Sequence, residues 1–235
     1  VQLLNEMDMK VNASMGIHIH VGTRNHRLPL DRNFKALQRL VALNARNEHA
    51  LYASSGSKRR EQCYYAASTR RQFAEVSRNA TSVRCFSELQ KYRTLNMRNL
   101  TGSKKTVEFR VFQSTTRIKK IAAYIQMVLG LVEKAYATKR QAKWSVNRNK
   151  WQGGYGAMKQ LLLDLNWNNK KDGHEVGHRY GLLIDEMDPS ELGHRRGLPN
   201  LVQMRKELDR LAKKYDRDER SSNYNVIDRT ITATG

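Results

Sequence analysis

Two histidines on a short predicted strand are the first residues whose types and spacing could do chemistry. Residues 16–22 read GIHIHVG, and in an extended strand residues two apart share a face. His18 and His20 therefore point to one side, and the isoleucine and valine side chains around them point to the other. Two imidazoles on one face can bind a metal ion, although such a pair is more often a plain surface or core feature.

A second predicted strand, residues 106–112 with the sequence TVEFRVF, carries an acid and a base. Strict alternation gives this strand a mixed side and an apolar side. The first side holds Glu108, Arg110 and Phe112, and the second holds Val107, Phe109 and Val111. Glu108 and Arg110 could form a structural ion pair; equally, Glu108 could bind a metal ion and Arg110 an anionic oxygen.

Two more arginines stand just before this strand. Arg93 and Arg98 lie in KYRTLNMRNL, residues 91–100. Guanidinium groups form bidentate hydrogen bonds with phosphate oxygens. These two side chains could therefore converge on phosphate groups.

Helices must position these strands, and the apolar periodicity predicts three of them in the first part of the chain. Residues 31–54 form the first, with Asp31 as its N-cap, and residues 61–75 form the second. The clearest helix covers residues 116–139, because its apolar residues recur at i, i+3 and i+4 and form one core-facing stripe.

The character of the sequence changes after that long helix. Lys, Arg and Asn become frequent, a glycine loop is expected at residues 153–156, and short helices are predicted for 157–165 and 201–215. We therefore expect two parts: a body over residues 1–140 and a basic extension of helices and loops over residues 141–235.

Composition limits the classes of protein. The chain has 235 residues, 39% of them hydrophobic, with only three prolines, which excludes a collagen-like chain and disfavours a wholly disordered one. The longest apolar stretch, residues 118–136, is interrupted by charged and amide side chains, so we expect a buried helix and no membrane span. Cys63 and Cys85 cannot form a disulfide framework and are predicted to be buried thiols in a reducing compartment.

The chain is strongly basic. It has 43 Lys and Arg residues against 22 Asp and Glu residues, a net charge of +21, and a pI near 10.2. An excess of this size favours contact with a polyanion, of which nucleic acid is the commonest. The extension holds many of the cations, with three tryptophans available for stacking or for protein contacts. These residues are Lys139, Arg140, Lys143, Arg148, Lys150, Lys170, Lys171, Arg179, Arg195 and Arg196, with Trp144, Trp151 and Trp167.

Taken in this order, the segments resemble the amidoligase family, a branch of the ATP-dependent carboxylate–amine ligases with a glutamine-synthetase-like fold. The resemblance covers residues 5–140. It runs through VNASMGIHIHVG (11–22), an Arg-then-Tyr segment at 60–65, KYRTLN (91–96), TVEFRVFQST (106–115) and the long closing helix. GIHIH is similar to the metal-binding G-M-H-C-H strand of glutamine synthetase, and EFR at 108–110 is similar to its E-x-R strand.

The resemblance implies a fold and a site. The fold would be α+β, with a curved, antiparallel, glutamine-synthetase-like sheet backed by the long helices, and residues 1–140 would be the C-terminal part of an amidoligase-like domain. His18 and Glu108 would hold Mg²⁺ or Mn²⁺, with His20 on the same face. Arg93 and Arg98 would bind the phosphates of ATP.

Glu108 and Arg110 are the catalytic residues that the resemblance implies. Arg110 would also contact the nucleotide, because it would stabilise the transferring phosphoryl group and the acyl phosphate. The reaction would join a carboxylate to an amine, each carried by a peptide or an amino acid, in an amide or isopeptide bond.

Amidoligases also open with a strand of the form G-x-E-x-E, whose glutamates complete the metal and nucleotide site, and nothing before Val11 supplies it. Either that strand precedes Val1, which favours an enzyme, or the chain is a ligase-like body without catalysis. In the second case it would be a basic structural or nucleic-acid-binding protein, such as a virion component. Such families occur in bacteria and in phage genomes, so the expected location is the cytoplasm or the inside of a phage particle.

A competing motif is HEVGH at residues 174–178, which fits the H-E-x-x-H pattern of zinc proteases with Glu175 as general base. Its context argues against that function. No apolar helical run precedes the motif, Gly177 lies within it, and Ile184 stands where the third histidine of a metzincin would fall. A solvated basic loop is the better interpretation.

Overall fold

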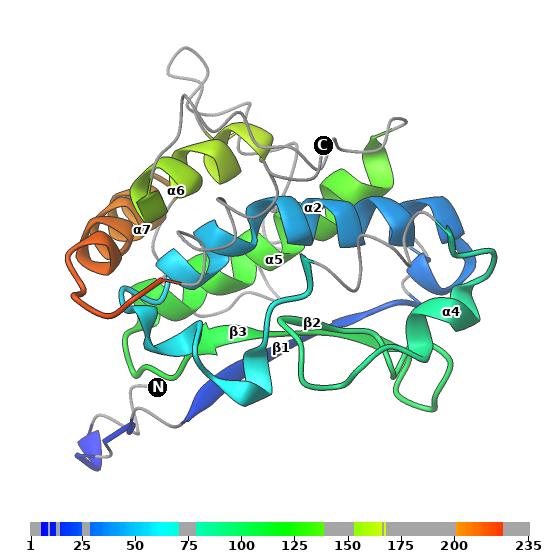
Figure 1. Cartoon of the computed structure of the whole chain (residues 1–235), viewed down its shortest axis with the longest axis horizontal. Coiled ribbons are helices and arrows are strands. Elements are labelled where there is room, and N and C mark those ends of the chain that lie inside the picture. The colour runs from blue at the N-terminus through cyan, green and yellow to red at the C-terminus, as the bar shows by residue number, and fades with distance from the viewer. Residues whose placement is uncertain are drawn as a thin grey trace, which may run out of the picture.

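A small antiparallel sheet lies under a stack of helices in the computed structural model of the chain (Figure 1). The structure describes residues 6–8, 10–12, 15–24, 29–70, 79–138, 153–165, 167 and 201–222. Within them, the helices and the sheet share one hydrophobic core. The predicted α+β class is confirmed.

The sheet has three strands in the order β1-β3-β2, all antiparallel. β1 is Gly16–Gly22, β2 is Leu95–Asn96 and β3 is Thr106–Gln113. The first and last of these match the two strands that the sequence predicts. β3 lies in the middle, so its side chains have a neighbour on each side.

The register between β1 and β3 shifts at one point. Ile17 pairs with Phe112, whereas Ile19 pairs with Phe109, so β3 contains one extra residue there. This bulge turns Phe112 to the apolar side, where it stacks on Tyr124 with ring centroids 4.3 Å apart. The prediction that Phe112 shares the side of Glu108 is therefore wrong, because strict alternation fails at a bulge.

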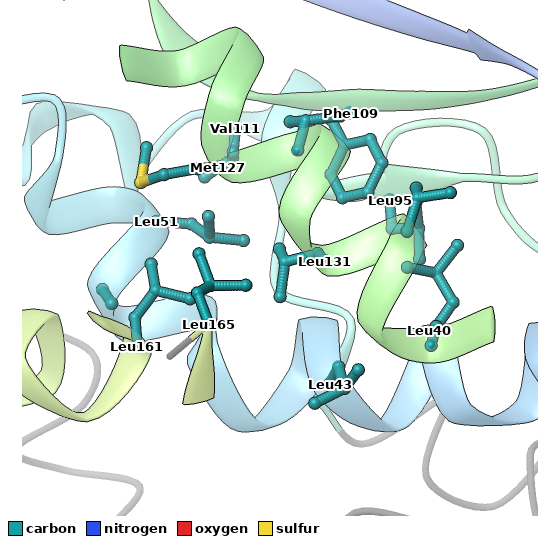
Figure 2. Packing of buried hydrophobic residues seen from close by; sticks show 14 of the residues in the cluster. Leu40, Leu43, Leu51, Leu95, Phe109, Val111, Met127, Leu131, Leu161 and Leu165 are labelled. Atoms are coloured by element: carbon teal, nitrogen blue, oxygen red, sulfur yellow. The ribbon is translucent and has the colours of Figure 1, made fainter. Parts of the chain in front are cut away.

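Two long helices cover the apolar side of the sheet, as predicted. α2 is Phe34–Ala53 and α5 is Ile118–Ala137. α2 begins later than expected because Leu30–Arg32 forms a short 3₁₀ helix first, so Asn33 and not Asp31 is the N-cap; its side chain accepts a hydrogen bond from the Ala36 amide at 3.0 Å. Figure 2 shows the resulting core, where leucines of α2 meet Met127 and Leu131 of α5 beneath Phe109.

Residues 61–69 do not form the helix predicted over 61–75, and residues 71–75 lie outside the described residues. Through Thr69 the chain instead forms 3₁₀ helices at Lys58–Arg60 and Tyr64–Ala66, followed by extended backbone. Ala67 makes a bridge with Arg93, and this extended pairing replaces the helical hydrogen bonds. A short helix, α4 (Val83–Ser87), follows before β2.

The two helices predicted in the extension are present and belong to the same core. α6 is Gly153–Asp164 and α7 is Leu201–Asp216, and Leu161, Leu208 and Tyr215 are almost completely buried. α6 packs on α2 and α7 packs on α5 and α6, as Figure 1 also shows. This part of the extension is thus built onto the body.

The predicted glycine loop at 153–156 is instead the first turn of α6. The Asp216 carboxylate at the end of α7 accepts hydrogen bonds from the amides of Gly154 and Tyr155, at 2.6 and 2.9 Å, and so caps the helix. A Cβ atom on Gly154 would lie 2.5 Å from the ring of Tyr215. Glycine is needed here because α6 and α7 approach so closely.

Two further expectations concern a membrane span and the cysteines. No helix among the described residues is both long enough and apolar enough to cross a membrane. Cys63 and Cys85 are free thiols, but both are partly exposed, so the prediction that they are buried is wrong.

Candidate active site

The carboxylate of Glu108 is the centre of a polar cluster on the side of the sheet that faces away from the helices. Its Oε1 atom lies 2.8 Å from Nδ1 of His18, 2.7 Å from Nη1 of Arg110 and 3.7 Å from Nε2 of His20. Its Oε2 atom accepts a hydrogen bond of 2.6 Å from the side chain of Asn96. Four side chains from three strands therefore converge on one carboxylate.

The register of the sheet explains this convergence. His20 pairs with Glu108 across β1 and β3, and Glu108 pairs with Asn96 across β3 and β2. Paired residues point to the same side of a sheet, so these three side chains form one row. His18 and Arg110 lie on the same face, two residues along their strands from His20 and Glu108.

The electrostatics of the cluster keep Glu108 ionised. Burial alone would raise the pKa of this carboxyl, but the hydrogen bonds from His18 and Asn96 and the charge of Arg110 outweigh burial and lower the pKa to about 2. Hydrogen bonds to the charged form make the largest contribution to lowering this pKa. At neutral pH the site contains a permanent negative charge beside a permanent positive one.

Exposure differs sharply within the cluster. The side chains of His18 and His20 are 34% and 40% exposed, whereas those of Glu108 and Arg110 are 5% and 8% exposed. The two imidazoles form the part of the site that solvent reaches, and the ion pair lies beneath them. A ligand approaching this face meets the imidazoles first.

Arg110 is fixed by several contacts. Its Nε atom donates to the carbonyl of Tyr65 at 3.1 Å, and its guanidinium lies over the ring of Tyr92, 5.6 Å from the centroid. Its own carbonyl accepts a hydrogen bond of 2.7 Å from Nη2 of Arg60. A second buried guanidinium therefore lies against the backbone of β3, next to the site.

Gly16 makes room for Arg60. A Cβ atom on Gly16 would lie 2.3 Å from Nη2 of Arg60. Because residues 16, 18 and 20 point to the same side of β1, Arg60 is on the face that carries the histidines. Packing against Arg60 therefore explains why the first residue of GIHIHVG is a glycine.

The other predicted phosphate-binding residues lie apart from Glu108. Arg93 donates from Nη1 to the carbonyl of Ser68 at 3.0 Å and from Nη2 to the side chain of Gln90. Arg98 is exposed, and its backbone amide donates to Oδ1 of Asn96 at 3.0 Å. In the part of the chain that the structure describes, neither guanidinium contacts Glu108, so their phosphate-binding role stays a prediction.

The donor set partly suits a divalent cation. It offers one ionised carboxylate and two imidazoles, and Mg²⁺ or Mn²⁺ would take its remaining ligands from water and phosphate. Arg110 already contacts the oxygen that both histidines face. Among the described residues, no group of three or more His, Cys, Asp or Glu side chains is arranged to hold a metal ion. The metal-binding roles of His18, His20 and Glu108 therefore stay predictions.

Sequence reasoning missed two features of the site. Asn96 closes the row beside Glu108, and it lies in the KYRTLN segment that carries the family resemblance. Tyr64, Tyr65 and Tyr92 form an aromatic cluster beside Arg110. The dipeptide YY and the KY of KYRTLN were the available signals.

Several predictions fall on residues outside the described ones. These are the HEVGH motif at 174–178 and the ten basic residues of the extension named above, from Lys139 to Arg196. Trp167 is described, and it is 2% exposed within the hydrophobic core. The expectation that Trp167 is available for stacking is therefore wrong, because its ring is used in packing.

Fold and site together define an α+β protein whose sheet presents a Glu–Arg pair beneath two imidazoles. The chain matches the family model Amidoligase_2, described as "Putative amidoligase enzyme", over residues 1–132. This match covers more than half of the chain, so the protein belongs to this amidoligase family. No curated protein and no solved structure matches the chain significantly.

Proposed function

We propose that the protein is an ATP- and Mg²⁺-dependent ligase that activates a carboxylate and transfers its acyl group to an amine. The observation that carries the proposal is the convergence of His18, His20, Asn96 and Arg110 on Glu108, in a chain of the amidoligase family. The three antiparallel strands backed by α2 and α5 are compatible with a glutamine-synthetase-like sheet.

The reaction has two steps. A carboxylate oxygen of the substrate attacks the γ-phosphorus of ATP, the bond to the β–γ bridging oxygen breaks, and ADP leaves. The amine nitrogen then attacks the acyl carbon of the acyl phosphate, the carbon–oxygen bond breaks, and phosphate and a proton leave. Both steps build negative charge on phosphoryl oxygens, so the site must supply fixed positive charge.

Arg110 is the residue best placed to supply that charge. Its guanidinium is held at three points by Glu108, Tyr65 and Tyr92, so little reorganisation is needed when charge develops nearby. Glu108 keeps Arg110 oriented. A divalent cation bound to the ionised Glu108 and completed by water and phosphate oxygens would neutralise charge on the phosphates.

The test is amine-dependent release of ADP. The full chain is incubated with ATP, Mg²⁺ and a panel of amino-acid and peptide carboxylates and amines. We expect Glu108→Gln and Arg110→Ala to lower the rate by about 100-fold or more, as loss of a group that stabilises the transition state does. Equal rates in the wild type and both variants would overturn the proposal.

Matched controls come from α4 and its C-cap residue. Arg84 and Glu88 form an ion pair of 3.0 Å that is exposed, with 83% and 65% of their side chains accessible. Glu88→Gln and Arg84→Ala repeat the two substitutions outside the site. We expect both controls to keep the wild-type rate, and the thermal unfolding midpoint of every variant shows whether it is folded.

A further inference from the structure

Three tyrosine rings form one cluster beside the candidate active site. The ring centroids of Tyr64, Tyr65 and Tyr92 lie 5.2 to 5.5 Å apart, with two of the three pairs nearly perpendicular. Such edge-to-face contacts are favourable for aromatic rings. The cluster holds its rings in fixed positions before any ligand arrives.

The cluster is unusually exposed for so much aromatic surface. Tyr64 is 70% exposed and Tyr65 is 55% exposed. Within the described residues, none of the three hydroxyl groups makes a hydrogen bond with the protein. The rings therefore do not serve the core, and neighbouring exposed aromatic rings are typical of a surface that binds something.

The cluster is joined directly to Arg110. The carbonyl of Tyr65 accepts a hydrogen bond from Nε of Arg110, and the ring of Tyr92 lies under the Arg110 guanidinium. Arg110 in turn lies 2.7 Å from Glu108. The tyrosines thus border the residue that would contact the reacting groups.

The charges around the cluster select the kind of ligand. Lys91 also lies over the Tyr92 ring, with its Nζ atom 5.5 Å from the ring centroid. Two cations already occupy positions around this ring, so a positively charged amine would be repelled. A ligand with a negative group for Arg110 and a flat apolar ring for the tyrosines complements the surface.

The position of the cluster distinguishes between two such ligands. In ATP, a ribose and two phosphates separate the base from the γ-phosphate, so a base would bind well away from the residue that contacts the transferring group. The acyl substrate brings its carboxylate to that residue, and its side chain lies nearby. The contact between the cluster and Arg110 therefore fits the acyl substrate.

We propose that Tyr64, Tyr65 and Tyr92 bind an aromatic ring of the acyl substrate, so that the site takes a carboxylate carrying a planar ring. This inference rests on the proposed ligase function, because "substrate" here means the carboxylate of that reaction. Binding of the ring to the tyrosines needs neither ATP nor catalysis, so it can be measured without turnover.

The test uses three probes with the full chain and no nucleotide. N-acetyl-L-phenylalanine has both the carboxylate and the ring, N-acetyl-L-alanine lacks the ring, and N-acetyl-L-phenylalanine amide lacks the carboxylate. Binding is measured by saturation-transfer NMR and by titration. We expect the first probe to bind more tightly than either of the others.

Substitutions locate the binding. Tyr64→Ala and Tyr65→Ala should each weaken binding of N-acetyl-L-phenylalanine roughly 2- to 10-fold, the range expected for one aromatic contact. Tyr155→Ala is the control, since it removes a tyrosine ring of α6 outside the cluster. Like Tyr92, Tyr155 has two cations over its ring, Lys159 at 4.4 Å and Lys213 at 4.9 Å. We expect this control to bind as the wild type does.

Four results would overturn the proposal. They are no detectable transfer to the ring protons of N-acetyl-L-phenylalanine, equal binding of the three probes, no effect of the Tyr64 and Tyr65 substitutions, and tyrosine-dependent binding of adenosine in place of the acid. The last would assign the cluster to the nucleotide. If the acid binds as expected but ADP release fails, the ring site stands and only the ligase function is lost.

Discussion

The Glu108 carboxylate is nearly buried, yet its contacts with His18, Asn96 and Arg110 favour the ionised form. A carboxylate with 5% of its side chain exposed would ordinarily be hard to ionise. Hydrogen bonds from His18 and Asn96, together with the charge of Arg110, reverse that tendency. The same contacts that orient Glu108 therefore also keep it negative.

Removing one of these contacts should move the pKa in a known direction. Asn96→Ala deletes the 2.6 Å hydrogen bond to Oε2, which favours the charged form, so the pKa of Glu108 should rise above its present value of about 2. NMR titration of the Glu108 side-chain carboxyl carbon measures the change. An unchanged pKa would show that Asn96 does not stabilise the carboxylate.

The sequence alone was enough to place part of this site. Alternation on two short strands put His18 with His20 and Glu108 with Arg110, and the sheet brings these pairs together. Asn96 could not be found this way, because β2 has only two residues and no periodicity extends over it. Its neutral amide also gives no charge signal.

At the scale of the element, β2 is positioned by a buried acid on α2. Glu48 is completely buried, and its carboxylate accepts hydrogen bonds from the amide and hydroxyl of Thr69 at 2.8 and 2.6 Å. The hydroxyls of Ser68 and Thr94 also donate to it. Glu48 thus holds the 67–69 segment against the start of β2, where the Thr94 carbonyl accepts from the Arg110 amide.

Glu48→Gln should weaken this arrangement. One carboxylate oxygen becomes an NH₂ group that faces donors, so we expect a loss of about 1–3 kcal/mol in the free energy of unfolding. Urea denaturation measures the loss. Glu88→Gln, at the exposed C-cap of α4, is the control and should change the value by no more than about 0.5 kcal/mol. A similar loss in both variants would contradict the role of Glu48.

The elements themselves were predicted unevenly. α5 has a strong apolar stripe, and its bounds were found to within two residues. The 61–69 segment lacks such a stripe, and its conformation depends on Glu48 and on the backbone of Tyr92 and Thr94, which are distant in sequence. Local patterns cannot report contacts of that kind, nor the bulge that turned Phe112 inward.

At the scale of the whole molecule, α2 connects the site to the C-terminal helices. Asp164 at the end of α6 accepts a hydrogen bond of 2.8 Å from Arg46 of α2. His49, on the same helix, packs edge-on against Tyr215 of α7, with ring centroids 5.5 Å apart. The change in composition at residue 140 gives no sign of these buried contacts.

His49 makes the stability of this assembly depend on pH. Burial, and then the charges of Arg70 and Lys58, lower its pKa to about 3. The pKa of a histidine in the unfolded chain is about 6.5. Between these values the unfolded chain binds more protons than the folded one, so the contribution of His49 to stability is complete above pH 6.5 and falls as the pH drops toward 3.

The measurement is the free energy of unfolding of the wild type and of His49→Phe across this range. The variant keeps an aromatic ring beside Tyr215 but cannot bind a proton. We expect its stability to fall less steeply between pH 6.5 and pH 4 than that of the wild type. Parallel pH profiles would show that His49 does not couple protonation to folding.

The proposed activity is activation of a carboxylate by ATP at the Glu108 cluster. The most direct measurement follows oxygen-18 from a labelled carboxylate substrate during amide formation. We expect one labelled oxygen to appear in inorganic phosphate for each amide formed. We expect Glu108→Gln to abolish this transfer and Glu88→Gln to leave it unchanged. Amide formation with unlabelled phosphate, or undiminished transfer in Glu108→Gln, would contradict the proposed activity.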